Sequence, residues 1–251
     1  MPIEIISREK QAAGQFNGGA IMENKPIGFP GEGGHTRPYS NLFYWAHAWS
    51  DGGSTIGEHP HQGFEIMSFV MAGDIEHYDS HYRAWKKLKA GDVQIIRAGN
   101  GISHAEKLNA GSHIFQIWVD PDLSKTLSQP ASYDDYEAAQ FPVHSHEGYR
   151  EKVYSGPDAP LEMDTPGMEI REITFTGGPC TLPLDAGQVA SLYVWSGAPE
   201  IGGQALKAHD FLIAREESAL EVHAAENDRI FMVVSPAAPG YRTYAQMRGM
   251  A

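Results

Sequence analysis

Short apolar runs, rich in β-branched and aromatic residues, recur along the chain, and glycine, proline, asparagine and aspartate separate them. Runs of this length between turn residues predict strands rather than helices. The predicted strands are Ile3–Ile6, Asn41–Trp49, Phe64–Met71, Ile75–Tyr78, Lys86–Lys89, Val93–Ile96, His113–Val119, Glu169–Phe175, Ser191–Trp195, Phe211–Ala214, Leu220–Ala224 and Ile230–Ser235. Short strands at regular spacing are typical of an antiparallel sandwich or barrel.

This rhythm stops between residues 121 and 150. The stretch Ser124–Gln140 is polar and acidic, and it predicts at most a short helix. The sequence therefore predicts an N-terminal domain over residues 1–125, a connecting segment over 126–150 and a C-terminal domain over 151–251. The stretch Tyr241–Met250 is expected to form either a short helix or a strand that returns to the first domain.

The composition supports short strands and argues against several classes of protein. The 251 residues include 27 glycines and 16 prolines, which favour many turns over long helices. The net charge of −13 argues against direct binding to nucleic acid or to an anionic membrane, although a protein partner stays compatible with it. The one cysteine, Cys180, allows no intrachain disulfide. With no visible signal peptide and no apolar run of about 20 residues, we expect a soluble, cytoplasmic protein.

Two short motifs carry the candidate chemistry. His59-Pro60-His61 and His104-Ala105-Glu106 each place two metal-binding side chains two residues apart. Residues two apart in a strand point to the same face, so two such doublets on neighbouring strands would direct four donor groups to one point. Three imidazoles and one carboxylate suit a divalent transition metal and leave coordination positions open, as a catalytic site requires.

Glu65 is an alternative to Glu106 as the carboxylate of this site. It follows His61 by four residues, and in a regular strand it would point with His59 and His61. Glu65 could therefore bind the metal in place of Glu106, or it could hydrogen-bond one of the metal ligands. The spacing leaves both possibilities open.

Other polar residues have weaker signals. His77, Asp79 and His81 follow the predicted strand and are expected to fix its turn more than to line a pocket. Gln116 is equally compatible with a hydrogen bond to a metal ligand and with a polar position in the core. A further doublet, His144-Ser145-His146, has no second doublet beside it, and we expect no metal there.

The motifs resemble known families. Residues 53–73 resemble the first cupin motif, with one extra residue, and residues 91–106 resemble a lengthened second cupin motif. The more particular sequences resemble the pirin family, and they are His59–Glu65, Glu76–Ser80, Gly91–Gln94, Gly99–Glu106 and Gln116–Val119. The resemblance extends over about residues 53–120. The usual entry pattern of pirins, rich in histidine and aspartate, is not recognisable in Gly14–Tyr39.

The resemblance implies an all-β bicupin fold, with two antiparallel β-barrel (jelly-roll) domains and few short helices. It implies one metal in the N-terminal domain and none in the C-terminal domain. The implied ligands are His59, His61, His104 and Glu106, so Glu65 would not bind the metal. Fe(II) is the first expectation for the ion, with Ni, Mn, Cu, Co and Zn as alternatives.

The resemblance also implies a function. Some bacterial pirins are associated with quercetin 2,3-dioxygenase activity, which implies a flavonol-like aromatic substrate, dioxygen as the second substrate, and Glu106 as the catalytic base. Other pirins act as metal-dependent regulators of transcription. The alternative for this chain is therefore a metal- or redox-sensing regulator that acts through a protein partner and performs no catalysis.

Overall fold

The computed structural model describes residues 3–251, which form three sheets of antiparallel strands and few helices. The helical elements of this part of the chain are α1 (Leu123–Thr126), α2 (Tyr244–Met247), η1 (Arg8–Lys10), η2 (Asn17–Gly19) and η3 (Ala138–Gln140). No helix within these residues is long and apolar enough to cross a membrane. The predicted all-β class is confirmed, and Met1 and Pro2 of the predicted N-terminal domain lie outside the described residues.

The chain divides into two compact units, each gathered from several segments. The N-terminal unit comprises Gln11–Gln140, Met163–Pro166 and Gly240–Ala251, and the C-terminal unit comprises Met1–Lys10, Phe141–Glu162 and Gly167–Pro239. The end of the chain thus belongs with the N-terminal unit. Of the two structures predicted for Tyr241–Met250, the chain forms the short helix, α2.

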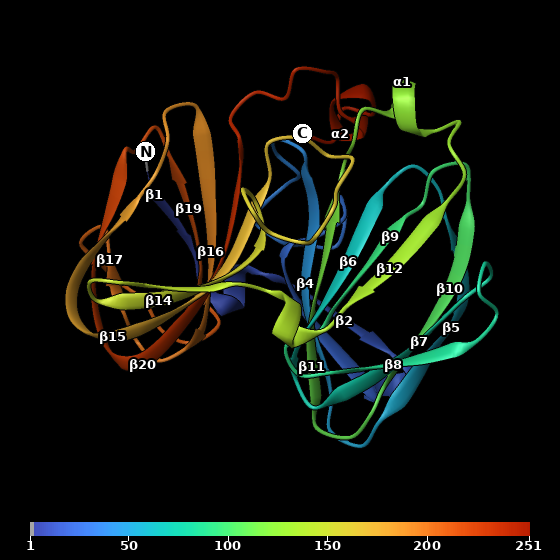
Figure 1. The fold of residues 1–251 in the computed structure, drawn as a ribbon, viewed down its shortest axis with the longest axis horizontal. Coiled ribbons are helices and arrows are strands. Elements are labelled where there is room, and N and C mark those ends of the chain that lie inside the picture. The colour runs from blue at the N-terminus through green and yellow to red at the C-terminus, as the bar shows by residue number, and fades with distance from the viewer. Residues whose placement is uncertain (1–2) are drawn as a thin grey trace. The chain divides into compact units, whose positions relative to one another are not determined.

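The N-terminal unit consists of two sheets, a smaller and a larger one (Figure 1). The smaller sheet contains, in spatial order, β5 (Ser54–His61), β10 (Ile102–Leu108), β7 (Asp74–Asp79) and β8 (Trp85–Lys89). The larger sheet contains β12 (Ser132–Tyr136), β9 (Val93–Arg97), β6 (Glu65–Ala72), β11 (Ser112–Val119), β4 (Leu42–Ser50), β3 (Ile21–Ile27) and β2 (Ala12–Phe16). Val70 and Ile114 of the larger sheet pack with Ile75 and Leu108 of the smaller one, so a hydrophobic core holds the two sheets together.

Strands β3 and β12 are absent from the sequence prediction, and both have charged residues that form ion pairs. On β3 the alternate buried positions include Glu23 and Lys25, whose charged groups lie 3.4 Å apart. A buried ion pair gives no hydrophobic alternation, so the strand does not show in the sequence pattern. Strand β12 lies in the stretch predicted to hold a short helix, and it is anchored at the edge of the sheet by an ion pair of 2.7 Å between Asp134 and Arg97 of β9.

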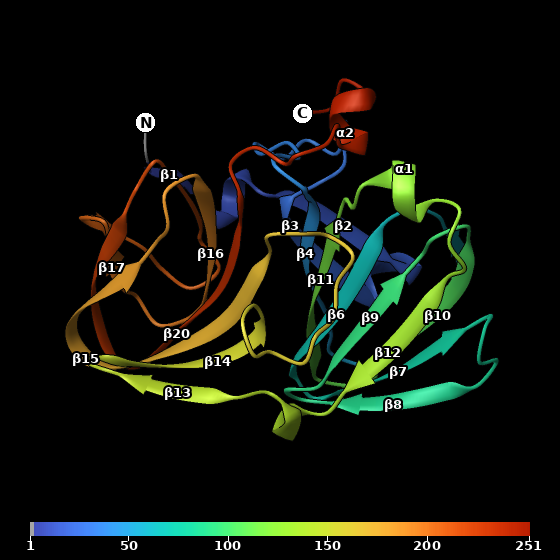
Figure 2. The same ribbon diagram turned by 45° about the horizontal axis from the view of Figure 1, so that its top comes forward.

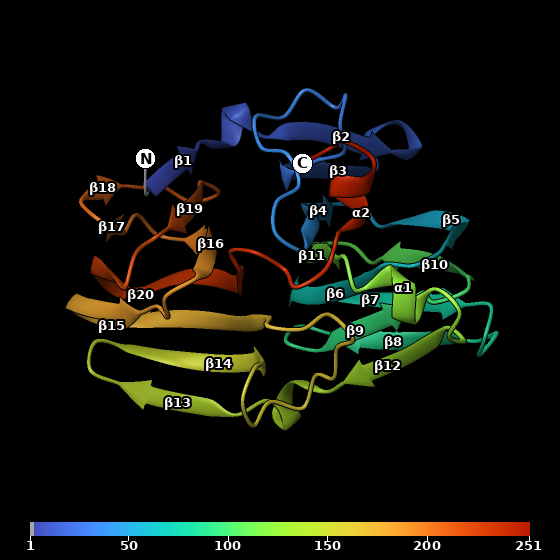
Figure 3. The ribbon, with the colours of Figure 1, turned by 90° about the horizontal axis from the view of Figure 1, so that it is seen from above.

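The C-terminal unit forms one curled sheet (Figures 2 and 3). Its main order is β1 (Ile3–Ile6), β19 (Phe211–Arg215), β16 (Gln188–Ser196), β20 (Ala219–Pro236), β15 (Glu169–Pro183), β14 (Tyr149–Ser155) and β13 (Val143–His146). The short strands β17 (Glu200–Ile201) and β18 (Gln204–Ala205) pair with each other, and β17 also pairs with β20.

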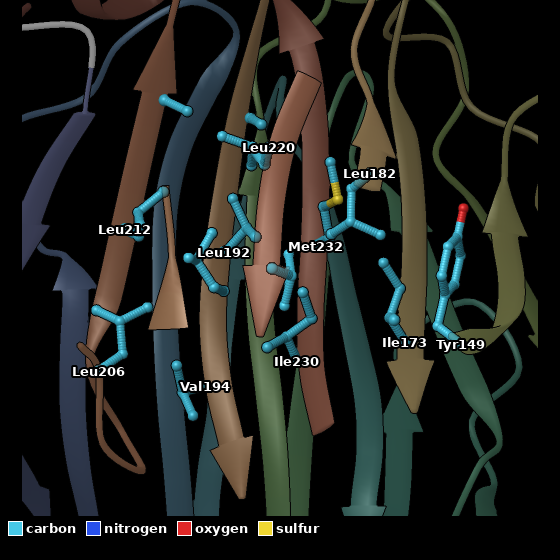
Figure 4. Packing of buried hydrophobic residues seen from close by; sticks show 14 of the residues in the cluster. Tyr149, Ile173, Leu182, Leu192, Val194, Leu206, Leu212, Leu220, Ile230 and Met232 are labelled. Atoms are coloured by element: carbon cyan, nitrogen blue, oxygen red, sulfur yellow. The ribbon is translucent and has the colours of Figure 1, made fainter. Parts of the chain in front are cut away.

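The predicted strands end at Phe175 and Ala224, whereas in the structure the chain continues beyond both residues in two long strands. Gly177–Pro179 lies within β15 and Glu226–Asp228 lies within β20, and the two strands stay paired on both sides of a register shift. Gly177 and Asn227 have positive φ values of 97° and 69°, which bend the strands without ending them. Residues from both sides of the bends, such as those labelled in Figure 4, therefore meet in one hydrophobic core.

Candidate metal centre

Strands β5 and β10 of the smaller sheet bring the two predicted doublets together, and Figure 1 shows these strands side by side. His104 of β10 lies directly opposite His59 of β5, and Ile102 lies opposite His61. A bulge follows on β5, so that Glu106 pairs with Ile56. The pairing places the three histidines on neighbouring positions of two strands, as their spacing predicted.

The three imidazoles converge through their Nε2 atoms. His104 Nε2 lies 2.9 Å from His61 Nε2 and 3.0 Å from His59 Nε2. Nitrogen donors at right angles around one ion, each about 2.1 Å from it, lie about 3.0 Å apart, whereas tetrahedral donors lie about 3.4 Å apart. The two separations therefore fit a divalent ion that keeps further positions open.

The protonation of the imidazoles also suits metal binding. His59 Nδ1 lies 2.8 Å from the carbonyl oxygen of Gly57, an acceptor, so Nδ1 carries the proton and Nε2 offers its lone pair to the centre. Burial and the neighbouring His59 lower the pKa of His61 to about 4. Burial also lowers the pKa of His104 well below its ordinary value. Neutral imidazoles are the form that binds metals.

Glu106 lies beside this cluster and is fully buried. Its carboxylate is near His104 and His77, and these three residues form a second group of potential donors that shares His104 with the first. Ser68 Oγ donates to Glu106 Oε1 at 2.8 Å, and Gln116 Nε2 donates to Oε2 at 2.5 Å. Of the two roles open to Gln116, the structure gives it a hydrogen bond to the predicted ligand Glu106.

His77 is part of the centre to an extent that the sequence prediction missed. It is fully buried, lies opposite Glu106 in the pairing of β7 with β10, and stacks on Tyr133 with ring centroids 4.9 Å apart. Gln94 Nε2 lies 3.2 Å from His77 Nε2. Burial lowers the pKa of His77 to about 3, so this imidazole is neutral. The sequence signal for His77 is the doublet His77-x-Asp79, whose spacing matches that of His104-x-Glu106 on the paired strand β10.

Asp79 has the turn-fixing role that the sequence predicted. Asp79 Oδ1 accepts hydrogen bonds from the backbone N–H groups of His81, at 2.7 Å, and Tyr82, at 2.8 Å. These bonds hold the turn that follows β7. His81 itself is exposed and stacks edge-on against Tyr82, so it takes no part in the histidine cluster.

Glu65 points away from the histidines, in contrast to the alternation argument. It accepts hydrogen bonds from the backbone N–H groups of Asp164 at 2.7 Å and Thr165 at 2.8 Å. The alternation fails because the chain leaves the smaller sheet after His61 and turns at Gly63, where φ is 85°, so Glu65 begins β6 in the larger sheet. Its partner is the 163–166 segment, and burial raises its pKa.

A pocket of about 550 Å³ opens beside His61. Its volume is within the range of about 300–1,000 Å³ that is usual for small-molecule sites. The lining residues are Pro60, His61, Gln62, Ser80, Gly101, Ile102 and Ser103. His61 also contacts Trp118 edge-on, with ring centroids 4.8 Å apart and planes at 84°. Of the predicted metal ligands, His61 is the one that lines this pocket.

Known proteins share this combination of motifs and fold. The Pirin family model matches residues 37–119. The Pseudomonas aeruginosa protein PA1210, named as a candidate quercetin 2,3-dioxygenase, is 33% identical over 198 residues, which cover 74% of this chain and 81% of that protein. The chain belongs to the pirin family. Human Pirin is 25% identical over 192 residues, which cover 72% of this chain and 66% of the human protein.

The solved structures of pirins share the fold. The Escherichia coli bacterial pirin YhhW in complex with nickel(II) matches with a TM-score of 0.78 and 21% identity, and the match covers 93% of this chain and 99% of that chain. At this identity the likeness shows the fold alone, and it confirms the predicted bicupin. This pirin-family chain is thus a cupin-type protein with a histidine and glutamate cluster that could bind a divalent metal ion.

Proposed function

We propose that the chain is a metal-dependent dioxygenase of the pirin type, with a flavonol-like substrate. One divalent transition metal would be held by His59, His61, His104 and Glu106. The observation that carries the proposal is the convergence of three imidazoles through Nε2, one of which, that of His61, lines a pocket. The name of the relative PA1210 supports quercetin or a related flavonol as the substrate class.

Fe(II) is our first choice for the ion, and nickel(II), which the YhhW structure holds, is the first alternative. Three imidazoles and one carboxylate accept either ion, and availability in the cell decides between them. When bound, such an ion supplies a Lewis acid for the enol oxygen of the substrate and a template that brings dioxygen close to it.

The residues of the chain have separate tasks in this proposal. The pocket beside His61 orients the aromatic rings of the substrate. Glu106, buried and held by Ser68 and Gln116, is the proposed acceptor for the proton of the flavonol hydroxyl group. Its two hydrogen bonds leave lone pairs on both carboxylate oxygens, so one oxygen can face the ion while a proton is taken up by the other.

The test is oxygen consumption with quercetin by the full-length protein reconstituted with Fe(II) or nickel(II). We expect oxygen uptake matched by loss of quercetin absorbance. The variant His104→Ala should lose both, whereas His146→Ala, in the C-terminal unit, should retain them. Metal-loaded wild-type protein that consumes no oxygen with flavonols would contradict the dioxygenase proposal. Metal-dependent capture of a protein partner by that same inactive protein would favour the regulator.

A further inference from the structure

A chain of hydrogen bonds connects Glu106 to two residues of β11. Gln116 Nε2 donates to Glu106 Oε2 at 2.5 Å, and Trp118 Nε1 donates to Gln116 Oε1 at 3.3 Å. Gln116 and Trp118 are two residues apart on one strand and therefore share a face. Ser68 of β6 holds the other carboxylate oxygen. Both oxygens of Glu106, a residue of the smaller sheet, are thus held by donors of the larger sheet.

The indole of Trp118 determines which way the Gln116 amide faces. An indole N–H can only donate, so it requires the carbonyl oxygen of Gln116, and a carboxylate only accepts, so Glu106 requires the amide nitrogen. The two requirements agree on one orientation of the amide. Turning the amide over would break both hydrogen bonds and would place the Gln116 oxygen against the Glu106 carboxylate. Trp118 therefore keeps Gln116 in its donating orientation.

Trp118 is itself fixed by aromatic neighbours. Its ring lies 5.2 Å from the ring of Tyr44 and 5.4 Å from that of Phe29, measured between centroids. The ring of Trp118 also makes an edge-on contact with His61, with centroids 4.8 Å apart. One side chain thus touches a predicted metal ligand through its ring and orients another predicted ligand, Glu106, through Gln116.

We propose that Gln116 and Trp118 are positioning residues of the metal centre. They hold the Glu106 carboxylate in the orientation in which it meets the ion bound by the three histidines. This inference rests on the proposed metal site and deepens it. Outer hydrogen-bond partners of metal ligands commonly change metal affinity by about 10–100-fold.

The experiment is a titration of metal-free, full-length protein with Co(II), a probe whose visible absorption depends on the number and kind of its ligands. Gln116→Leu should weaken Co(II) binding by about 10–100-fold and change the spectrum of the bound ion. Trp118→Phe keeps an aromatic ring against His61 and removes the hydrogen-bond donor. It should change the Co(II) affinity and the spectrum in the same direction as Gln116→Leu, but by a smaller amount. In the Gln116→Leu background, Trp118→Phe should add no further weakening, because it acts through Gln116.

Asn41→Leu is the matched control, since it removes a buried amide that donates to the carbonyl oxygen of Pro166 rather than to a residue of the metal centre. It should leave Co(II) affinity within about threefold of wild type and the spectrum unchanged. Equal losses in Asn41→Leu and Gln116→Leu would overturn the inference, and so would independent, multiplying effects of the two β11 substitutions. If Gln116→Leu bound Co(II) with the affinity and spectrum of wild type, the positioning role would be wrong, whereas the metal site itself would stand. Wild-type protein that binds no Co(II) would overturn the metal site as well.

Discussion

Two strands of the molecule carry a His-x-His doublet, His59-Pro60-His61 on β5 and His144-Ser145-His146 on β13. Both strands lie at the edge of their sheet. The neighbouring strands differ: β10 places His104 opposite His59, whereas β14 places Glu151 opposite His144. His104 is fully buried, while every residue of β13 is exposed.

The partner strand therefore determines what a doublet can do. In the C-terminal unit, His146 Nε2 lies 2.9 Å from Glu151 Oε1, and Arg171 bonds to the other oxygen of the same carboxylate at 3.2 Å. The His146 imidazole thus belongs to a hydrogen-bonded network with Glu151 and Arg171. In the N-terminal unit a third imidazole meets the doublet, and burial keeps His61 and His104 neutral. A His-x-His spacing becomes a candidate metal site only with a matching residue across the strand pair.

The largest expected effect on nickel(II) affinity comes from removing His104, the residue that faces the doublet from the neighbouring strand. His104→Ala should weaken nickel(II) binding by more than about 100-fold, because both close Nε2 contacts of the cluster involve His104. Isothermal titration with nickel(II) measures the change. His146→Ala is the control and should leave the affinity unaltered. If His146→Ala weakened binding as much as His104→Ala, the distinction between the doublets would be wrong.

The next effect concerns stability, and it distinguishes the role of Glu65 from that of Glu106. Glu65→Ala removes the buried carboxylate that accepts hydrogen bonds from the backbone N–H groups of Asp164 and Thr165, which should lower the free energy of unfolding by about 2–4 kcal/mol. Urea denaturation measures this loss. Nickel(II) affinity of the folded variant should stay within about threefold of wild type. Glu147→Ala, at an exposed position, should cost less than about 0.5 kcal/mol.

Glu106→Gln tests the remaining predicted ligand. The substitution keeps the size of the side chain and removes its charge, so nickel(II) affinity should fall by about 10–100-fold while stability changes little. Titration and thermal unfolding of the same preparation separate the two quantities. An affinity equal to that of wild type would remove Glu106 from the ligand set and leave a centre of three histidines.

The smallest expected effect is that of pH on nickel(II) affinity. Because the pKa of His61 is lowered to about 4 and that of His104 lies well below its ordinary value, protons compete with the metal at these two residues only in acid. Two histidines with the ordinary pKa of about 6.5 would together cost about 100-fold in affinity on going from pH 7.5 to 5.5. We expect a much smaller fall in nickel(II) affinity over this range. A fall in affinity of about 100-fold would show that His61 and His104 are not shielded from solvent.

Much of the fold and of the site follows from local patterns. Apolar alternation predicted strands such as His113–Val119, and the two-residue spacing predicted that His59, His61 and His104 would meet. Strand β3 was not predicted, because the buried ion pair of Glu23 and Lys25 puts charged residues at positions where the pattern requires apolar ones. Alternation could not predict the direction of Glu65, because it does not encode the change of sheet at Gly63.

The residues that surround Glu106 are a second feature that could not be predicted from the sequence. Ser68, Gln116 and His77 come from three different strands, and their meeting depends on the register between strands and between sheets. Spacing within one strand carries no information on that register. The sequence could therefore name a glutamate beside the histidines, whereas its surroundings required the structure.

The central claim is that the histidine cluster of the N-terminal unit binds one transition metal. Elemental analysis of full-length protein purified without an affinity tag tests it most directly, with His104→Ala and His146→Ala purified in parallel. We predict close to one transition-metal ion per chain in wild type and in His146→Ala, and almost none in His104→Ala. Wild-type protein without stoichiometric metal, or His104→Ala protein that retains it, would contradict the claim.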